Sequence, residues 1–195
     1  AVLAETLRDF DNVKVVQADV MEVDLHQLIQ DEFSGLDVLV CANLPYYITS
    51  PVIMKLLEEK LPVESLTVMV QKEAAVRICA APGTRACGAV SVAVQYYSQP
   101  QILFDVPRDC FFPAPNVDSA VIRLNIRTEP PVKLETEEKQ FFKLVKAAFG
   151  QRRKTVLNSL STGLGKSKEE LSAALQQAGI APTARAEQLT MEQFG

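Results

Sequence analysis

The chain lacks tryptophan, has one histidine, and contains no apolar run near the ~20 residues that a membrane-spanning helix needs. It also shows no signal peptide, so we expect no membrane partner. The few cysteines show no Cys-x-x-Cys spacing: Cys41, Cys79, Cys87 and Cys110. This pattern favours reduced thiols, a cytoplasmic location and no metal site. The single histidine, His26, lies in a polar stretch, which argues against a catalytic role.

The composition is typical of a globular protein, with 48% hydrophobic and 23% charged residues over 195 positions. This length suits one substantial domain and a second small one. The net charge of -4 hides a gradient, because residues 133–195 contain 10 Lys or Arg against 7 Asp or Glu. A basic C-terminal region is compatible with a module that faces nucleic acid.

Apolar runs that indicate strands alternate with amphipathic stretches that indicate helices up to residue 130. Ser50, followed by Pro51, predicts the start of one of these helices. After Glu129, Pro130 and Pro131 the pattern becomes wholly helical. We therefore predict an α/β domain over residues 1–130 and a small all-α domain over residues 131–195. The strands are predicted at residues 13–20, 36–42, 65–70, 102–106 and 119–126.

Four residues at the end of one predicted strand carry the clearest chemical signal: Asn43, Leu44, Pro45 and Tyr46. The preceding run, residues 36–42, predicts a strand buried on both faces, as in parallel sheets. The four residues then lie at the carboxyl end of this strand, where ligands bind in open α/β sheets.

The tetrapeptide offers two oxygen acceptors and a ring. Asn43 carries an amide oxygen, and Pro45 favours an extended Leu44, whose carbonyl can point at the same spot. Tyr46 adds a flat face on which a base can stack. This set fits the exocyclic amine of adenine, whose nucleophilic form the two acceptors would stabilise. The alternative is a simple strand exit, with Asn43 and Pro45 as turn formers.

An acidic residue and an aromatic loop accompany this site. Asp19 and Val20 end the predicted strand 13–20, so the carboxylate can reach the same edge, although Asp19 could equally cap the next helix. Phe111 opens a loop stiffened by two prolines, which lowers the entropy cost of presenting a ring to a partner. The same loop could be only a hydrophobic cover.

Arg152, Arg153 and Lys154 follow Gly150, which is predicted to end a helix, and they are predicted to open the next one. Three cations at a helix start oppose the helix dipole, and RNA phosphate could offset that cost. A solvated surface run is the alternative.

These segments together resemble the ribosomal RNA adenine dimethyltransferase family of the small-subunit type. The resemblance is carried by residues 18–20, 43–46, 70–73, 111–120 and 148–155, in the order of the family. It implies a class I, Rossmann-like methyltransferase domain with a helical C-terminal RNA-binding domain. It also implies dimethylation of two adjacent adenosines near the 3′ end of small-subunit ribosomal RNA by S-adenosylmethionine, with a role in ribosome biogenesis. The partner would be that RNA or the immature small ribosomal subunit.

The resemblance also assigns roles to individual residues. Asp19 and Val20 would bind the cofactor, and Asn43 would lie between cofactor and target base. The acceptors would be Asn43 and the Leu44 carbonyl, and Tyr46 and Phe111 would sandwich the adenine. Arg152, Arg153 and Lys154 are the expected RNA contacts.

The family's first strands and glycine-rich cofactor loop have no counterpart in these 195 residues. We therefore expect a portion of a longer enzyme, incomplete at both ends, with weak or absent cofactor binding and no activity of its own. In this fold, strand 13–20 would lack its neighbour and be prone to swapping, disorder or improvised pairing. Two other functions stay open: a noncatalytic module for RNA binding or ribosome assembly, and a large-subunit RNA methyltransferase of the macrolide-resistance type.

Overall fold

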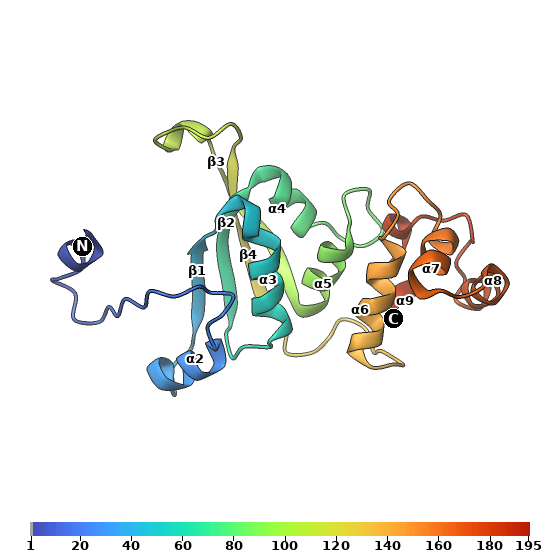
Figure 1. Cartoon of the computed structure of the whole chain (residues 1–195), viewed down its shortest axis with the longest axis horizontal. Helices are drawn as coiled ribbons and strands as arrows, with labels where there is room; N and C mark the ends of the chain where they lie inside the picture. The colour runs from blue at the N-terminus through green and yellow to red at the C-terminus, as the bar shows by residue number, and fades with distance from the viewer. Residues whose placement is uncertain (1) are drawn as a thin grey trace.

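The computed structural model describes residues 2–195 and is built around one mixed sheet of four strands (Figure 1). The strands are β1 (Leu39–Asn43), β2 (Ser65–Gln71), β3 (Ser98–Val106) and β4 (Ser119–Ile126). Their order across the sheet is β1-β2-β4-β3. β1 and β2 run parallel, and the other neighbours are antiparallel. The carboxyl ends of β1, β2 and β3 therefore lie at one edge, together with the start of β4.

Three helices pack against one face of this sheet: α3 (Thr49–Glu58), α4 (Lys72–Ile78) and α5 (Ala89–Tyr97). Their apolar side chains share a core with alternate residues of the central strands, where Val68 and Ile122 have no exposed surface. The period of two along β2 and β4 places these residues on the same side. The predicted strands 65–70 and 119–126 are confirmed.

The first predicted strand is wrong: residues 13–18 are irregular, with exposed Val13, Val15 and Val16. A strand needs a neighbour for its backbone hydrogen bonds, and no described segment pairs with this one. The burial predicted for 36–42 is also wrong on one face, since Leu39 and Cys41 are exposed. β1 is an edge strand in the described sheet, and the face that carries Leu39 and Cys41 stays exposed.

Ser50 is not the cap of α3, because a short turn, η1 (Tyr46–Ile48), leads directly into the helix. The Ile48 amide and the Thr49 hydroxyl both donate to the Pro45 carbonyl, at 3.1 and 3.3 Å. The turn already satisfies the groups that a capping side chain would serve. The helix therefore begins one residue before Ser50.

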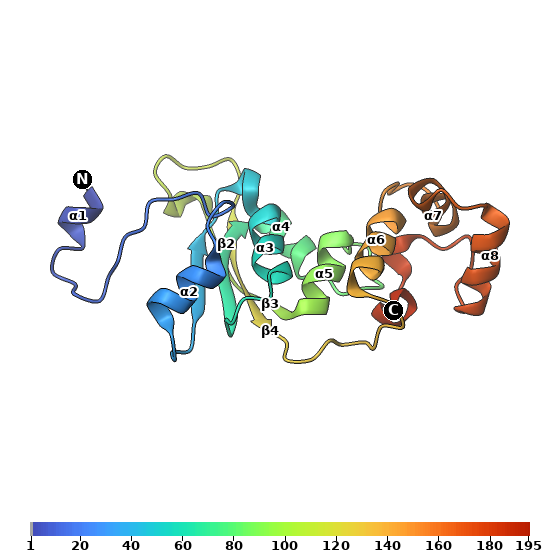
Figure 2. The same cartoon turned by 60° about the horizontal axis from the view of Figure 1, so that its bottom comes forward.

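The C-terminal part is helical, as predicted, and lies beyond α5 as seen from the sheet (Figure 2). It consists of α6 (Glu138–Ala148), α7 (Val156–Leu164), α8 (Lys168–Gln177) and α9 (Met191–Phe194). The remaining short elements are α1 (Val2–Thr6), α2 (Leu25–Phe33), η2 (Arg108–Cys110) and η3 (Ala186–Gln188). Ala1 lies outside the described residues. None of the described helices is long and apolar enough to cross a membrane.

Helix α5 joins the two parts of the molecule. Val94 belongs to the core under the sheet, whereas Val92 and Tyr96 belong to a second core formed with α6–α9. The Tyr96 ring lies 5.3 Å from that of Phe141 on α6, so aromatic packing holds α6 against α5. The two parts thus share one helix, and the division at residue 130 stays a prediction.

Candidate functional site

The tetrapeptide leaves β1 with two oxygen atoms free. The Leu44 amide donates to the Met69 carbonyl on β2 at 3.3 Å, which extends the parallel ladder by one bond. The Pro45 carbonyl is used by the turn that starts α3. Among the described residues, neither the exposed Asn43 side chain nor the Leu44 carbonyl has a hydrogen-bond partner. The Asn43 side chain is open to solvent, whereas Leu44 is buried. Their role as acceptors for a ligand stays a prediction.

Tyr46 is fixed by a residue 73 positions away. Its hydroxyl lies 2.7 Å from the Ser119 hydroxyl oxygen at the start of β4. Ser119 is fully buried, so this bond holds the half-buried ring of Tyr46 beside Asn43 at the sheet edge. Ser119 was not among the predicted site residues. Its place in the same loop motif as Phe111 was the only sequence signal for it.

The aromatic loop, residues 107–118, lies at the same edge of the sheet. Ser119 pairs with Gln71 and with Val106, so the loop begins and ends beside the exit of β2. The Asp118 carboxylate accepts from the Arg108 amide at 3.0 Å and closes the base of the loop. The Phe111 ring is half-buried and makes no ring contact with Tyr46 among the described aromatic pairs. The sandwich of adenine between Tyr46 and Phe111 stays a prediction.

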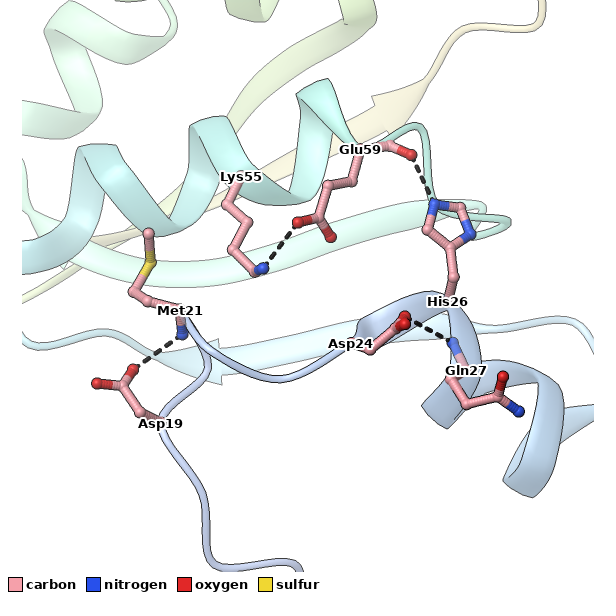
Figure 3. A network of polar contacts seen from close by, with 7 residues as sticks. All are labelled: Asp19, Met21, Asp24, His26, Gln27, Lys55 and Glu59. Atoms are coloured by element: carbon pink, nitrogen blue, oxygen red, sulfur yellow. Dashed lines mark hydrogen bonds and ion pairs between the residues drawn. The ribbon is translucent and has the colours of Figure 1, made fainter.

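Asp19 forms a tight turn ahead of α2 (Figure 3). One carboxylate oxygen accepts from the Met21 amide at 2.8 Å, while the other has no partner among the described residues. Asp24, rather than Asp19, caps α2 by accepting from the Gln27 amide at 2.9 Å. The free oxygen of Asp19 and the exposed Val20 next to it fit a partial cofactor contact, such as an adenine amine. That role stays a prediction.

His26 has a structural role, as its polar surroundings suggested. Its Nε2 atom lies 2.7 Å from the Glu59 carbonyl, next to the end of α3 (Figure 3). Lys55 donates to the Glu59 carboxylate at 2.7 Å on the same stretch of chain. The histidine therefore ties α2 to α3, away from the tetrapeptide at the other end of that helix.

The basic residues Arg152, Arg153 and Lys154 lie in the turn between α6 and α7, so the predicted helix start is wrong. The reason is Thr155, whose side chain accepts from the Asn158 amide and caps α7. All three cations are exposed, and none has an ion pair among the described residues. They lie outside the helix and are free to contact an anion.

The cysteines offer no activated nucleophile in the interior. Burial raises the pKa of Cys79 and of Cys87 to about 11, so both thiols are protonated near neutral pH. All four cysteines are free thiols. No cluster of three or more metal-ligating side chains occurs within residues 2–195.

Comparison with known proteins gives the same assignment as the motifs. The family model described as ribosomal RNA adenine dimethylase matches residues 1–195. The chain is 53% identical over 194 residues to ribosomal RNA small subunit methyltransferase A of Alkaliphilus metalliredigens (strain QYMF), covering 99% of this chain and 67% of that protein. The protein of the same name from Alkaliphilus oremlandii (strain OhILAs) is 54% identical over 195 residues, covering 100% and 68%. The chain thus spans about two thirds of the length of these relatives.

Two solved structures share the fold. A dimethyladenosine transferase from Plasmodium falciparum superposes with a TM-score of 0.72 at 23% identity, covering 97% of this chain and 72% of that one. The 23S rRNA methyltransferase ErmE superposes with a TM-score of 0.66 at 25% identity, covering 99% and 73%. The predicted Rossmann-like α/β class is confirmed. With the family model matched from end to end and relatives above 50% identity, this chain belongs to the ribosomal RNA adenine dimethylase family.

Proposed function

We propose that this protein dimethylates the exocyclic amines of two adjacent adenosines near the 3′ end of small-subunit ribosomal RNA, in the cytoplasm. One observation carries the proposal: the Asn43 side chain and the Leu44 carbonyl are unpaired among the described residues, beside a Tyr46 ring held by Ser119. The relatives that are about half identical to the chain carry the name of a small-subunit methyltransferase, which supports this substrate over large-subunit RNA.

S-Adenosylmethionine, when bound, supplies the methyl group. Asn43 Oδ1 and the Leu44 carbonyl oxygen each accept one N–H of the adenine amine. The amine nitrogen would become positive as its bond to the methyl carbon forms and the bond from that carbon to the cofactor sulfur breaks, leaving a neutral thioether, and the nitrogen would then lose one proton. Acceptors that hold its hydrogens would stabilise the positive charge, with two hydrogens held in the first transfer and one in the second. Tyr46 stacks on the base and offsets part of the few kcal/mol that unstacking costs. Asp19, through its free carboxylate oxygen, would hold the cofactor.

The experiment is methyl transfer to immature small ribosomal subunits that lack the modification. It uses the chain joined to the first strands and glycine-rich cofactor loop that the family resemblance implies. We expect two neighbouring adenosines to gain two methyl groups each, as measured by mass spectrometry of nuclease fragments. The 195-residue chain alone is the control and should bind the cofactor weakly or not at all.

Other results would replace the proposal. Methylation of large-subunit RNA in place of small-subunit RNA would assign the chain to the macrolide-resistance type. The 23S rRNA methyltransferase ErmE, whose fold the chain shares, acts on large-subunit RNA. RNA binding without methyl transfer by the joined chain would identify a noncatalytic assembly module.

A further inference from the structure

Two hollows flank the point where β2 ends. The first has a volume of about 470 Å³ and lies between the α4–α5 region and the α6–α7 turn. The second, of about 560 Å³, lies between the start of α4 and the aromatic loop. The residues that matter in the first are Ser50, Gln71, Glu73, Arg77, Arg85 and Arg152. Those in the second are Gln71, Lys72, Glu73, Arg108, Asn116 and Asp118.

The two hollows share a wall at the end of β2, and no residue of the tetrapeptide lines either of them. Gln71 and Glu73 line both of them. Gln71 is paired with Ser119, the residue that holds the Tyr46 hydroxyl. Ser50, in the first hollow, lies in the helix that follows the tetrapeptide. The shared wall of the two hollows is therefore next to the place proposed for the target base.

The first hollow holds more cations than carboxylates, and the second holds one cation with only a long ion pair. In the first, Arg77 pairs with Glu73, while Arg85 and Arg152 are exposed, share the hollow with Glu187, and have no ion pair among the described residues. In the second, Lys72 donates to the Asp105 carboxylate at 2.7 Å, and this ion pair neutralises the charge of Lys72.

Arg108 makes only a long contact with Asp109, at 3.8 Å between nitrogen and oxygen. Asn116 is exposed and has no hydrogen-bond partner among the described residues. The second hollow thus offers a weakly held guanidinium and a free amide.

We infer that the two hollows form one track for single-stranded RNA, with the target adenosine at their shared wall. Nucleotides on one side of that adenosine would contact Arg85 and Arg152, and those on the other side Arg108 and Asn116. This inference rests on the proposed function. It adds Arg85 and Arg108, which lie outside the basic run 152–154, to the RNA contacts. An RNA segment whose base is drawn out for chemistry is unpaired on both sides of that base, which suits a narrow two-sided track.

The test is RNA binding by the 195-residue chain over a series of salt concentrations. The probe is a fluorescein-labelled single-stranded RNA of about ten nucleotides with two central adenosines, a length within the usual range for such sites. We expect Arg85→Ala and Arg108→Ala each to weaken binding about tenfold. Each should also reduce the slope of log affinity against log salt by about 0.7, the value for one lost phosphate contact on a single strand.

Two matched variants control the measurement. Lys168→Ala removes an exposed cation on α8 that lines neither hollow, and it should change neither affinity nor slope. Arg85→Lys keeps the charge and should restore most of the slope. Unchanged slopes in both alanine variants, equal binding of a duplex of the same sequence, or no binding by the unmodified chain would each overturn the track. Methyl transfer is not read in this assay, so the track and the proposed reaction can fail independently.

Discussion

Asn43 and Leu44 each present an oxygen that no other described group uses, at the end of a strand that fixes their backbone. Asn43 is exposed, so its side chain contributes little to packing. In the proposed reaction, its side chain would act by stabilising the positive charge that develops on the target amine. A change at Asn43 should therefore affect methyl transfer and leave the stability of the fold almost unchanged.

We predict that Asn43→Ala lowers methyl transfer by about 10²–10³-fold, the usual effect of removing one preorganised polar group at a developing charge. The free energy of unfolding should change by no more than about 0.5 kcal/mol, as for other surface substitutions. Single-turnover kinetics and denaturant unfolding measure the two effects. Asn12→Ala, at another exposed asparagine, is the control. Undiminished turnover in Asn43→Ala would remove the acceptor mechanism.

Ser119 acts through Tyr46 as a positioning residue. Ser119→Ala and Tyr46→Phe each remove the same 2.7 Å hydrogen bond, and both variants keep the aromatic ring at position 46. We expect each to lower kcat about tenfold or less, the range for one neutral hydrogen bond, with little change in the RNA concentration at half-saturation. Because both changes break one bond, the double variant should be no slower than either single variant. Additive losses would show that the two hydroxyls act separately.

The helices α6 and α7 pack closely because Gly163 faces Ala147. A Cβ atom on Gly163 would lie 2.7 Å from Ala147 Cβ and 3.0 Å from Ala147 Cα. Contacts this short force one helix to move. The close approach also places the turn that carries Arg152, Arg153 and Lys154, since that turn joins the two helices.

We predict that Gly163→Ala lowers the free energy of unfolding by about 1 kcal/mol. Overpacking costs roughly 1–3 kcal/mol, and alanine returns up to about 1 kcal/mol of helix propensity. Denaturant unfolding measures the change. Thr162→Ala, at the exposed neighbouring position in the same helix, is the control and should not destabilise the protein. A gain in stability for Gly163→Ala would mean that the helices separate without cost.

At the scale of the whole molecule, Glu138 links α6 to the sheet-bearing part. Its carboxylate accepts from Tyr97 at the end of α5 at 2.6 Å and from Lys60 after α3 at 2.8 Å. Burial raises the pKa of Glu138, but the hydrogen bonds from Lys60 and Tyr97 outweigh burial, and the net pKa is lowered. Burial, followed by the bond to Glu138, raises the pKa of Tyr97.

A carboxyl whose pKa is lowered in the folded state contributes stability above its unfolded pKa of about 4.3 and loses it as the pH falls further. We therefore predict that Glu138→Gln destabilises the protein at pH 7 and that this difference shrinks below about pH 4. Urea unfolding at both pH values measures it. Glu135→Gln, at an exposed acid without an ion pair among the described residues, is the control. A difference that does not vary with pH would show that the carboxylate charge contributes nothing.

The sequence predicted a structural feature correctly where the interactions that form it join residues close together in the chain. The predicted span of β4 is confirmed, since the period of a strand depends on residues a few positions apart. The free acceptors at Asn43 and Leu44 also follow from a strand that ends before a proline turn.

Tertiary structure decided the features that depend on distant partners. Val13 to Val20 has the composition of a strand, yet it forms none, because strand pairing requires backbone donors and acceptors on an adjacent strand. The Tyr46–Ser119 bond joins residues 73 positions apart, and Arg85 meets Arg152 in one hollow only through the packing of α6 against α5. The sequence by itself predicted which residues would carry the chemistry. Only the folded chain decided which of them meet, because long-range pairing depends on packing that no local pattern encodes.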